Sequence, residues 1–367
     1  MAKARIYLDY NATTPLRIEA REAMIAAMDI VGNPSSVHAE GRAAKMLVER
    51  ARAQVAELVG CKPQQVIFTS SATEAAALAV AQKGRHRGTF AALPTEHDCL
   101  GVWSGRTLQS LYDGDGNQIR HESDMGTGLI AVSAANSETG IMRPNLRVAG
   151  SGEGYFALCD ITQMAGKMPV IYEEITPSYA ILSAHKMGGP KGVGALINFT
   201  ADDPEPMLLG GGQEMNRRSG TENVIGIAGF GAAAEAANRD VSEGKWSEVE
   251  ELRIILEKTI ASTSKQTIFV GNQVARLPNT SCILTPGWKG ETQVMQMDLA
   301  GFAVSAGSAC SSGKVKASKV LMAMGYEEEE ATSAIRVSLG LETTRNEIMR
   351  FTDAWCSAFE KHQKRAA

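Results

Sequence analysis

The sequence lacks several features that would place it in a specialised class of protein. No apolar run approaches the ~18 residues that a membrane span needs, and no apolar signal core follows the N-terminal Met1–Arg5. The net charge of −4 argues against a nucleic-acid binder. We find no internal repeat and no low-complexity segment. We therefore expect a soluble, cytoplasmic protein with no nucleic-acid and no membrane partner.

Cysteine is scarce and scattered. The 367 residues include six cysteines, and no two of them have the spacing of a metal site. A disulfide framework is not expected in a chain of this size without a secretion signal, so most of these thiols should be small core residues. Cys310 differs, because it lies in Ser305–Gly313, a run of small residues that predicts a mobile loop. It is either an unremarkable exposed thiol or a reactive nucleophile on a mobile loop.

What is present is an ordinary globular composition. With 44% hydrophobic and 21% charged residues, the chain can form one large and one smaller domain. In its first half, helical patterns alternate with short apolar runs, which predicts a mostly parallel sheet covered by helices. We expect helices at 16–30, 36–59 and 223–237, and strands at 66–69, 129–134, 155–159, 179–182 and 195–199.

The pattern changes near residue 245, which indicates a smaller α+β domain from there onward. We expect helices at 246–262, 291–299 and 316–324, and strands at 281–284, 302–305 and 334–338. The polar residues 360–367 are expected to fray.

Lys186 is the first candidate functional residue. It follows the predicted strand at 179–182 and precedes Gly188–Pro190, a turn that no regular helix tolerates. An amine held there can form a Schiff base with an aldehyde cofactor, pyridoxal phosphate. Burial beside a cofactor would lower its pKa and leave the amine free to attack. The alternative is a surface lysine before a turn.

Two further segments fit the same cofactor. Asp160 ends a predicted strand and could pair with a protonated pyridine nitrogen, while Gln163 could donate to the phenolic oxygen. Ser71–Glu74 has the pattern of a capping box, and the helix it begins would offer the N–H groups of Ala72 and Thr73 to a phosphate. Taken singly, each segment is equally an ordinary helix cap.

Two more side chains could act at such a site. His97 could stack on a pyridine ring and shuttle protons near neutral pH, or it could be a surface-loop histidine. Arg336 lies in the apolar run 334–338, where a buried arginine needs a partner. That partner is either a substrate carboxylate, bound by both arms of the guanidinium, or an internal acid.

Together with the segment around Cys310, these residues resemble the cysteine desulfurases of the class-V aminotransferase family. Further motifs fit, among them Leu8–Pro15, Gly32–Ser36, Arg218–Thr221 and Ser338–Gly340. The resemblance implies a fold-type I pyridoxal-phosphate enzyme, α/β in class, with a three-layer αβα large domain and a mostly parallel seven-stranded sheet. It implies an arm (1–15) packing on the small domain, a large cofactor-binding domain (16–244) and a small α+β domain with the cysteine loop (245–367).

The resemblance also implies a role for each matching residue. Pyridoxal phosphate would be bound by Ala72, Thr73, His97, Ser137, Asp160, Gln163, Ser183, His185, Lys186 and Thr221. Thr221 would reach the phosphate of the partner subunit, so that a homodimer completes the site. Asn11 and Arg336 would hold the substrate carboxylate, and Lys186, His97 and Cys310 would be catalytic. Ser137 stands where the family has the second of two asparagines.

The implied reaction converts L-cysteine to L-alanine and leaves a persulfide on Cys310. An iron–sulfur scaffold or a sulfur-carrier protein would accept the sulfur, for general or nitrogenase cluster assembly or for tRNA thiolation. No intrinsic metal site is expected, although Cys310 could share a cluster transiently with a scaffold. The alternatives are a selenocysteine lyase, another class-V aminotransferase, and a non-catalytic partner protein that retains the fold.

Overall fold

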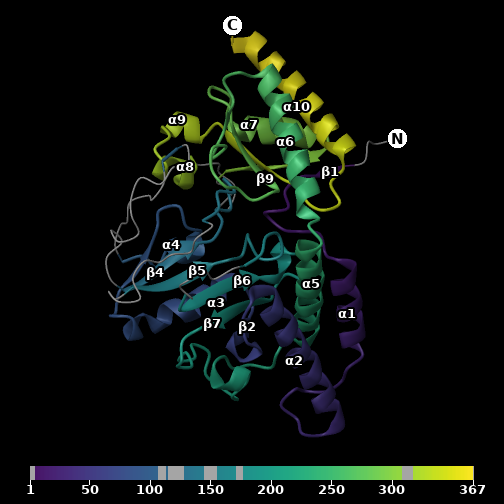
Figure 1. Cartoon of the computed structure of the whole chain (residues 1–367), viewed down its shortest axis with the longest axis vertical. Coiled ribbons are helices and arrows are strands. Elements are labelled where there is room, and N and C mark those ends of the chain that lie inside the picture. The colour runs from purple at the N-terminus through teal and green to yellow at the C-terminus, as the bar shows by residue number, and fades with distance from the viewer. Residues whose placement is uncertain are drawn as a thin grey trace.

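A mixed sheet forms the centre of the larger of two lobes (Figure 1). The computed structural model describes residues 5–105, 113–114, 128–143, 155–170, 177–307 and 317–366. Within them the sheet has six strands in the order β2-β7-β6-β5-β4-β3. These are β2 (Val66–Thr69), β3 (Phe90–Ala92), β4 (Gly128–Ser133), β5 (Tyr155–Asp160), β6 (Tyr179–Ser183) and β7 (Gly194–Asn198).

The sheet is parallel except for one strand, because β7 runs antiparallel to its neighbours β2 and β6. The mostly parallel sheet is thus confirmed, but the described residues form six strands where seven were predicted. The strand β3, of three residues, lies between the strands expected at 66–69 and 129–134, where the sequence predicted no strand.

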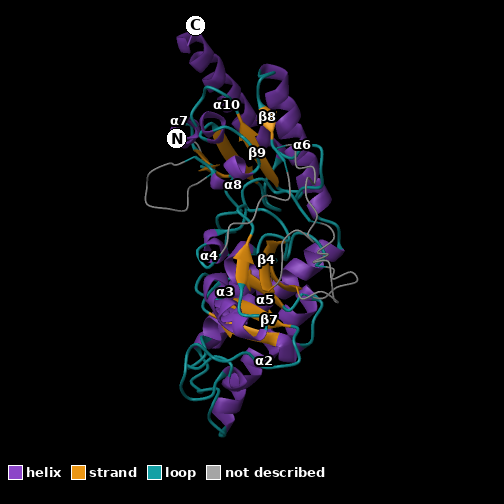
Figure 2. Ribbon diagram, turned by 90° about the vertical axis from the view of Figure 1, so that its left-hand side faces the viewer, coloured by secondary structure: helices purple, strands orange, loops and turns teal. Residues whose placement is uncertain are grey.

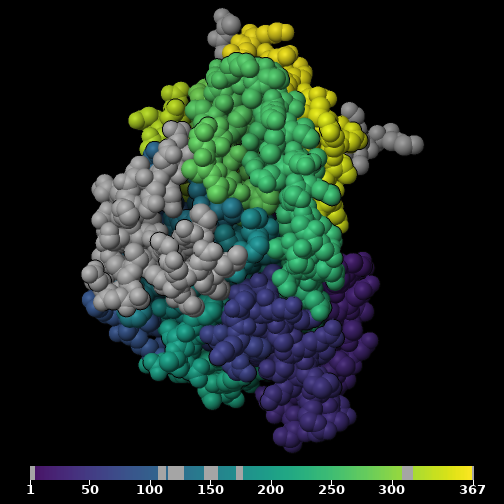
Figure 3. All heavy atoms as spheres, viewed as in Figure 1, coloured from purple at the N-terminus to yellow at the C-terminus, as the bar shows by residue number. Residues whose placement is uncertain are grey.

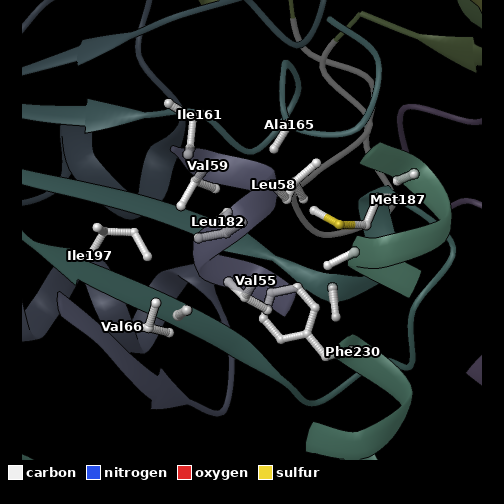
Figure 4. Close-up of a cluster of buried hydrophobic side chains, with 14 of the residues drawn as sticks. Val55, Leu58, Val59, Val66, Ile161, Ala165, Leu182, Met187, Ile197 and Phe230 are labelled. Atoms are coloured by element: carbon white, nitrogen blue, oxygen red, sulfur yellow. The ribbon is translucent and has the colours of Figure 1, made fainter. Parts of the chain in front are cut away.

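Alternating side chains attach helices to both faces of this sheet. Val66 and Phe68 of β2 pack with α2 (Ala39–Val59) and α5 (Val224–Ser242), whereas Ile67 packs with α3 (Ala72–Ala81) on the opposite face. Figure 2 shows the strands between the two helical layers, and Figure 4 shows side chains of the first cluster, among them Phe230 of α5. This is a three-layer α/β/α arrangement.

The small residues of α5 permit close helix packing. A Cβ added at Gly231 would lie 2.5 Å from the Cα of Ala51 on α2. One at Gly229 would lie 2.6 Å from the side chain of Met24 on α1 (Ile18–Met28). The helices therefore approach α5 at distances that larger side chains would prevent.

The second lobe is built on an antiparallel sheet of order β11-β12-β9-β8. Its strands are β8 (Ile268–Phe269), β9 (Thr280–Leu284), β11 (Ser305–Ala306) and β12 (Ala334–Ser338). Its helices are α6 (Trp246–Thr263), α7 (Gly290–Leu299), α8 (Lys319–Ala323), α9 (Glu328–Ala331) and α10 (Arg345–Ala366). The N-terminal helices and the C-terminal residues lie at opposite ends of the molecule (Figure 3).

The last helix corrects the expectation of a frayed tail, because α10 continues to Ala366. The buried side chains Ile348, Phe351, Trp355 and Phe359 attach it to the small-lobe core. Their spacing of three or four residues is that of one helix face, which is a local signal for this helix in the sequence. No helix in the described ranges is long and apolar enough to cross a membrane.

The N-terminal arm crosses from the small lobe to the large one. Its strand β1 (Ile6–Tyr7) pairs in parallel with β10 (Phe302–Ala303), and Asp9 bridges to Ser338 of β12. Three residues later, Ala12 contacts Lys186 of the large lobe. The domain boundaries at residues 15 and 244 stay a prediction. The contacts of the arm with β10 and β12 agree with an arm that packs on the small domain.

Candidate active site

A cavity of about 490 Å³ lies at the carboxyl ends of β4, β5 and β6, beside the start of α3 and the arm. In open α/β sheets, ligands bind at this edge of the strands. Its lining includes these predicted site residues: Asn11, Ala72, Thr73, His97, Ser137, Asp160, Gln163, Ser183, His185, Lys186 and Arg336. Thr221 lines a different cavity, of about 110 Å³. Cys310 lies outside the described residues.

Lys186 stands one turn beyond the end of β6. A short 3₁₀ turn (Ala184–Lys186) follows the strand, and Gly188 then adopts a φ of +88°, which reverses the chain. The amine Nζ of Lys186 donates to the carbonyl oxygens of Asn11 at 2.6 Å and Ala12 at 2.9 Å. The arm therefore fixes the position of the amine that the sequence singled out.

Asp160 and Gln163 face the same cavity from the end of β5 and the turn after it. Asp160 accepts a hydrogen bond from the backbone N–H of Thr162 at 2.9 Å, as an aspartate beginning a turn does. No helix follows Asp160 in residues 161–170, so the helix-cap alternative is wrong; its side chain lines the cavity, and its pairing with a cofactor stays a prediction. Gln163 donates through Nε2 to the carbonyl oxygen of Asn11 at 3.1 Å.

The start of α3 offers donors to an anion. Ala72 and Thr73 are its first two residues, so their N–H groups have no acceptor within the helix. Ser71 caps the helix by accepting from the N–H of Glu74 at 3.3 Å. The carboxylate of Glu74 accepts instead from the N–H of Ser70 at 2.7 Å, so the predicted capping box is shifted by one residue on that side.

His185 and Ser183 extend this group of donors. His185 lies 3.2 Å through Nδ1 from the hydroxyl of Thr13. Burial, and then the charges of Lys186 and Lys191, lower the pKa of His185 to about 4. The imidazole is therefore neutral near pH 7 and adds a hydrogen-bond donor without adding charge.

His97 begins α4 (Asp98–Gly101), a short helix that the sequence did not indicate. Its Nδ1 accepts from the backbone N–H of Cys99 at 3.1 Å. Since an accepting Nδ1 carries no proton, the neutral ring has its proton on Nε2. Cys99 also lines this cavity, and burial raises the pKa of its thiol.

Arg336 approaches the cavity from β12 and is paired with an acid of the arm. Its Nη2 donates to Asp9 at 2.7 Å, and its Nη1 donates to the carbonyl oxygen of Ser137 at 3.1 Å. The buried Nε has no hydrogen-bond partner among the described residues. The internal ion pair is thus present, and the N–H group at Nε of the guanidinium stays unused.

Asn11 is 1% exposed and holds the arm in place. Its Nδ2 donates to Thr280 at 2.8 Å and to the carbonyl oxygen of Ser137 at 3.3 Å. Ser137 itself thus meets the site through its backbone carbonyl, where both Asn11 and Arg336 donate to it.

Sequence reasoning missed Asp9, which lines the cavity, and Lys167, which lies behind it. Asp9 lines the cavity and accepts from Arg336 and, at 2.7 Å, from Ser305. It begins the turn that contains Asn11, in which the N–H of Ala12 donates to the carbonyl oxygen of Asp9 at 3.0 Å. Lys167 donates to the side chain of Gln163 at 2.9 Å from four residues further on. Residues 163–167 lie in turns and not in a helix, so no local spacing indicated this contact.

The residues present fit pyridoxal phosphate. The cavity volume lies within the range of small-molecule sites, ~300–1,000 Å³. The side chains of Lys186 and Asp160 and the uncapped N–H groups of Ala72 and Thr73 line it together. An amine, a carboxylate and a helix N-terminus are the groups that an aldehyde, a pyridine nitrogen and a phosphate require.

Comparison with known proteins gives the family. Residues 6–351 match the family described as Aminotransferase class-V. A cysteine desulfurase of Frankia sp. (strain EuIK1) is 38% identical, over 95% of this chain and 90% of that protein. The cysteine desulfurase IscS of Dictyoglomus turgidum is 35% identical, over 98% of this chain and 95% of that protein.

Solved structures with a similar fold cover nearly the whole chain. A NifS-like protein from Rickettsia africae ESF-5 has a TM-score of 0.87 at 32% identity and covers 97% of this chain and 99% of its own. SspA, solved in complex with cysteine, has a TM-score of 0.75 at 25% identity, over 92% of this chain and 100% of its own.

Proposed function

Because this chain belongs to the class-V aminotransferase family and, within it, to the cysteine desulfurases, we propose that it transfers the sulfur of L-cysteine to Cys310 and releases L-alanine. One observation carries the proposal. Side chains from the arm, α3, β5, the turn after β6, and β12 line a single cavity that contains an amine, a carboxylate and a guanidinium. Cysteine in the solved structure of SspA, a neighbour in fold, supports this choice of substrate.

Pyridoxal phosphate would be held by the residues predicted for it. Asp160 would keep the pyridine nitrogen protonated, Gln163 would donate to the phenolic oxygen, and His97 would lie over the ring. Ala72, Thr73, Ser183 and His185 would bind the phosphate, and Lys186 would attach to the cofactor covalently. When bound, the cofactor supplies an electron sink that acidifies the Cα–H bond of an amino acid.

The chain's own residues would then position the substrate and move protons. Arg336 would bind the substrate carboxylate through Nη1, the nitrogen that now donates to Ser137. Asn11 would contribute Nδ2 by exchanging its longer bond, 3.3 Å to Ser137, for the carboxylate. The free amine of Lys186, or His97, would take the Cα proton.

The sulfur step balances without an added oxidant. The Cys310 thiolate attacks the substrate sulfur, an S–S bond forms and the Cβ–S bond breaks. The electron pair of the broken bond stays with carbon, which is protonated and leaves as alanine. Cys310 follows Gly307, which lines the cavity, by three positions in the sequence.

We propose further that the enzyme is a homodimer that delivers sulfur to a scaffold or carrier protein in the cytoplasm. Thr221 is exposed and lies outside the main cavity of its own chain, as a residue serving the partner's phosphate would. Exposed apolar side chains such as Ile18, Ile25 and Met28 of α1 are available for an interface. The five cysteines in the described ranges are all free thiols, which suits a reducing compartment.

The first test concerns Lys186. The purified protein should show the visible absorbance of covalently bound cofactor, and Lys186→Ala should abolish it while leaving secondary structure intact. Lys265→Ala, at an exposed lysine of the small lobe, is the matched control. An unchanged spectrum in Lys186→Ala would refute the proposed attachment.

The second test concerns the sulfur acceptor. Cys310→Ser should change the cofactor spectrum on adding cysteine yet release neither alanine nor sulfide above background. Cys356→Ser, at a half-buried thiol of α10, should behave as the unmodified protein. If Cys310→Ser turns over normally and Cys99→Ser does not, the thiol that lines the cavity is the acceptor, and the assignment to Cys310 is wrong.

A further inference from the structure

A second buried lysine lies directly behind the site. Lys167 is 2% exposed and does not line the main cavity. Its Nζ donates to Oε1 of Gln163 at 2.9 Å and to Oδ1 of Asn11 at 3.1 Å. No carboxylate in the described ranges pairs with it. A buried lysine without an acid partner is rare in folded proteins, because an unpaired charge costs free energy in the interior.

The two acceptors indicate that this amine is neutral. A neutral amine has two N–H groups, and two carbonyl oxygens lie within hydrogen-bond distance of them. An ammonium would carry a third N–H with no acceptor in the described ranges. The charged side chains that act on Lys167 are also cationic, and they disfavour a further positive charge. Burial, and then Lys186 and Arg336, lower the pKa of Lys167 well below its usual value.

Other ionisable groups lie on the far side of Lys167. They line a smaller cavity, of about 130 Å³, that Lys167 also lines: Tyr10, Arg17 and Glu342. Arg17 is already paired with Asp240 at 2.5 Å, and no ion pair joins Glu342 to Lys167 in the described part of the chain.

The contacts of Lys167 determine which way the amide of Gln163 faces. Lys167 is the donor to Oε1, so the Nε2 group must point the other way, toward the carbonyl oxygen of Asn11 at 3.1 Å. The same carbonyl oxygen accepts from Nζ of Lys186 at 2.6 Å. If the Gln163 amide turned over, its Oε1 would face that oxygen, and two acceptors would repel each other.

We propose that Lys167 is a positioning residue: its neutral amine fixes the amide of Gln163 and the side chain of Asn11, and through them the donor Nε2 and the amine of Lys186 that face the cofactor. This inference rests on the proposed function for its consequence in catalysis. Lys167 itself does not line the cavity in which substrate and cofactor would bind.

The test compares Lys167→Met, which removes the donor and keeps the length, with Lys167→Gln, which restores a donor amide. Lys265→Met is the control for loss of a surface lysine charge. We expect Lys167→Met to weaken cofactor binding about tenfold, since a buried acceptor is left without a donor. It should also shift the pH midpoint of the cofactor's visible absorbance. Lys167→Gln should recover most of both effects, and Lys265→Met should show neither.

A structural role alone would give a different result. Lys167→Met would then lower the unfolding temperature while cofactor affinity and the absorbance midpoint stay at their original values, and that outcome would overturn the proposal. If Lys167→Met does not fold, the same comparison in a Gln163→Leu background decides. There the substitution should have little further effect on cofactor affinity, and a full additional tenfold loss would contradict action through Gln163.

A readout without cofactor separates this inference from the proposed function. In a crystal structure of cofactor-free Lys167→Met, the 3.1 Å contact between Nε2 of Gln163 and Asn11 should be lost. Its persistence would overturn the role of Lys167. By contrast, if the unmodified protein shows no absorbance that depends on Lys186, the proposed function is refuted. The contact between Gln163 and Asn11 would then still decide whether Lys167 positions Gln163.

Discussion

The buried ion pair of Arg52 and Glu214 gives the sharpest prediction of stability. The two side chains are 3% and 2% exposed and are joined by two hydrogen bonds, of 2.7 and 2.9 Å. The backbone N–H of Phe68 also donates to Glu214 at 3.0 Å. The pair anchors Glu214–Asn216, three consecutive residues with φ of 48°, 58° and 66°. Non-glycine residues adopt such angles at a cost of ~1–2 kcal/mol each.

The perturbation is Arg52→Met, which keeps the bulk of the side chain and removes its charge. Glu214 would then be buried with one N–H donor, and removal of one partner of a buried pair costs ~3–5 kcal/mol. Adding Glu214→Leu removes the second charge too, so the double variant should recover most of that loss. Arg239 and Glu19 form an exposed pair, at 50% and 38%, and Arg239→Met should cost only ~0–1 kcal/mol.

The assay is urea unfolding followed by circular dichroism. With a denaturant dependence of ~2–3 kcal/mol/M, the midpoint for Arg52→Met should fall by ~1–2.5 M. The reasoning is refuted if Arg52→Met unfolds with the midpoint of Arg239→Met, or if the double variant is as unstable as the single one.

Three further predictions concern the site. Gly188→Ala should lower the urea midpoint more than Gly192→Ala. Both positions have positive φ, but only at Gly188 would a Cβ meet a side chain, 2.5 Å from Cγ of Arg17. Equal losses in the two variants would contradict this reasoning, because the side chain of Arg17 would then have moved away at no cost. The pKa of His185 is depressed to about 4, so stability should fall as pH drops from ~6.5 to ~4, and His185→Gln should reduce that fall in urea midpoints measured at pH 7 and 5. Burial raises the pKa of Glu138 to about 7, so its contribution has the opposite sign and is lost as pH rises from ~4.5 to ~7. Glu138→Gln should lose less stability than the unmodified protein between pH 5 and 7, and an unchanged pH dependence would contradict the shift.

Local patterns in the sequence predicted the elements that carry their own signal. The strand β2 and the helices α2 and α6 lie within a few residues of their expected positions, because apolar periodicity is a local property. The helix cap of α2 was less predictable, since His38, and not Ser36, accepts from the N–H of Gly41. The short β3 had too few residues to show alternation.

Pairings between distant residues could not be predicted in the same way. The partner of Arg336 is Asp9, 327 positions away, and the sequence left open whether an internal acid or a substrate would meet this arginine. The structure shows that Nη2 of Arg336 donates to Asp9 while Nε stays unpaired. Lys167 likewise looked unremarkable, because its burial depends on the arm folding over it.

The sequence by itself determined the chemistry available here: an amine after a strand, an acid at the end of another strand and a helix start rich in small residues are local facts of Lys186, Asp160 and Ala72. Only the tertiary structure decided how these groups work together. The arm places Asn11 between Lys167, which donates to its side-chain oxygen, and Lys186, which donates to its backbone oxygen. No local sequence pattern encodes these two contacts. Hydrogen-bond direction and burial arise from packing of the whole chain, so they appear only once the chain has folded.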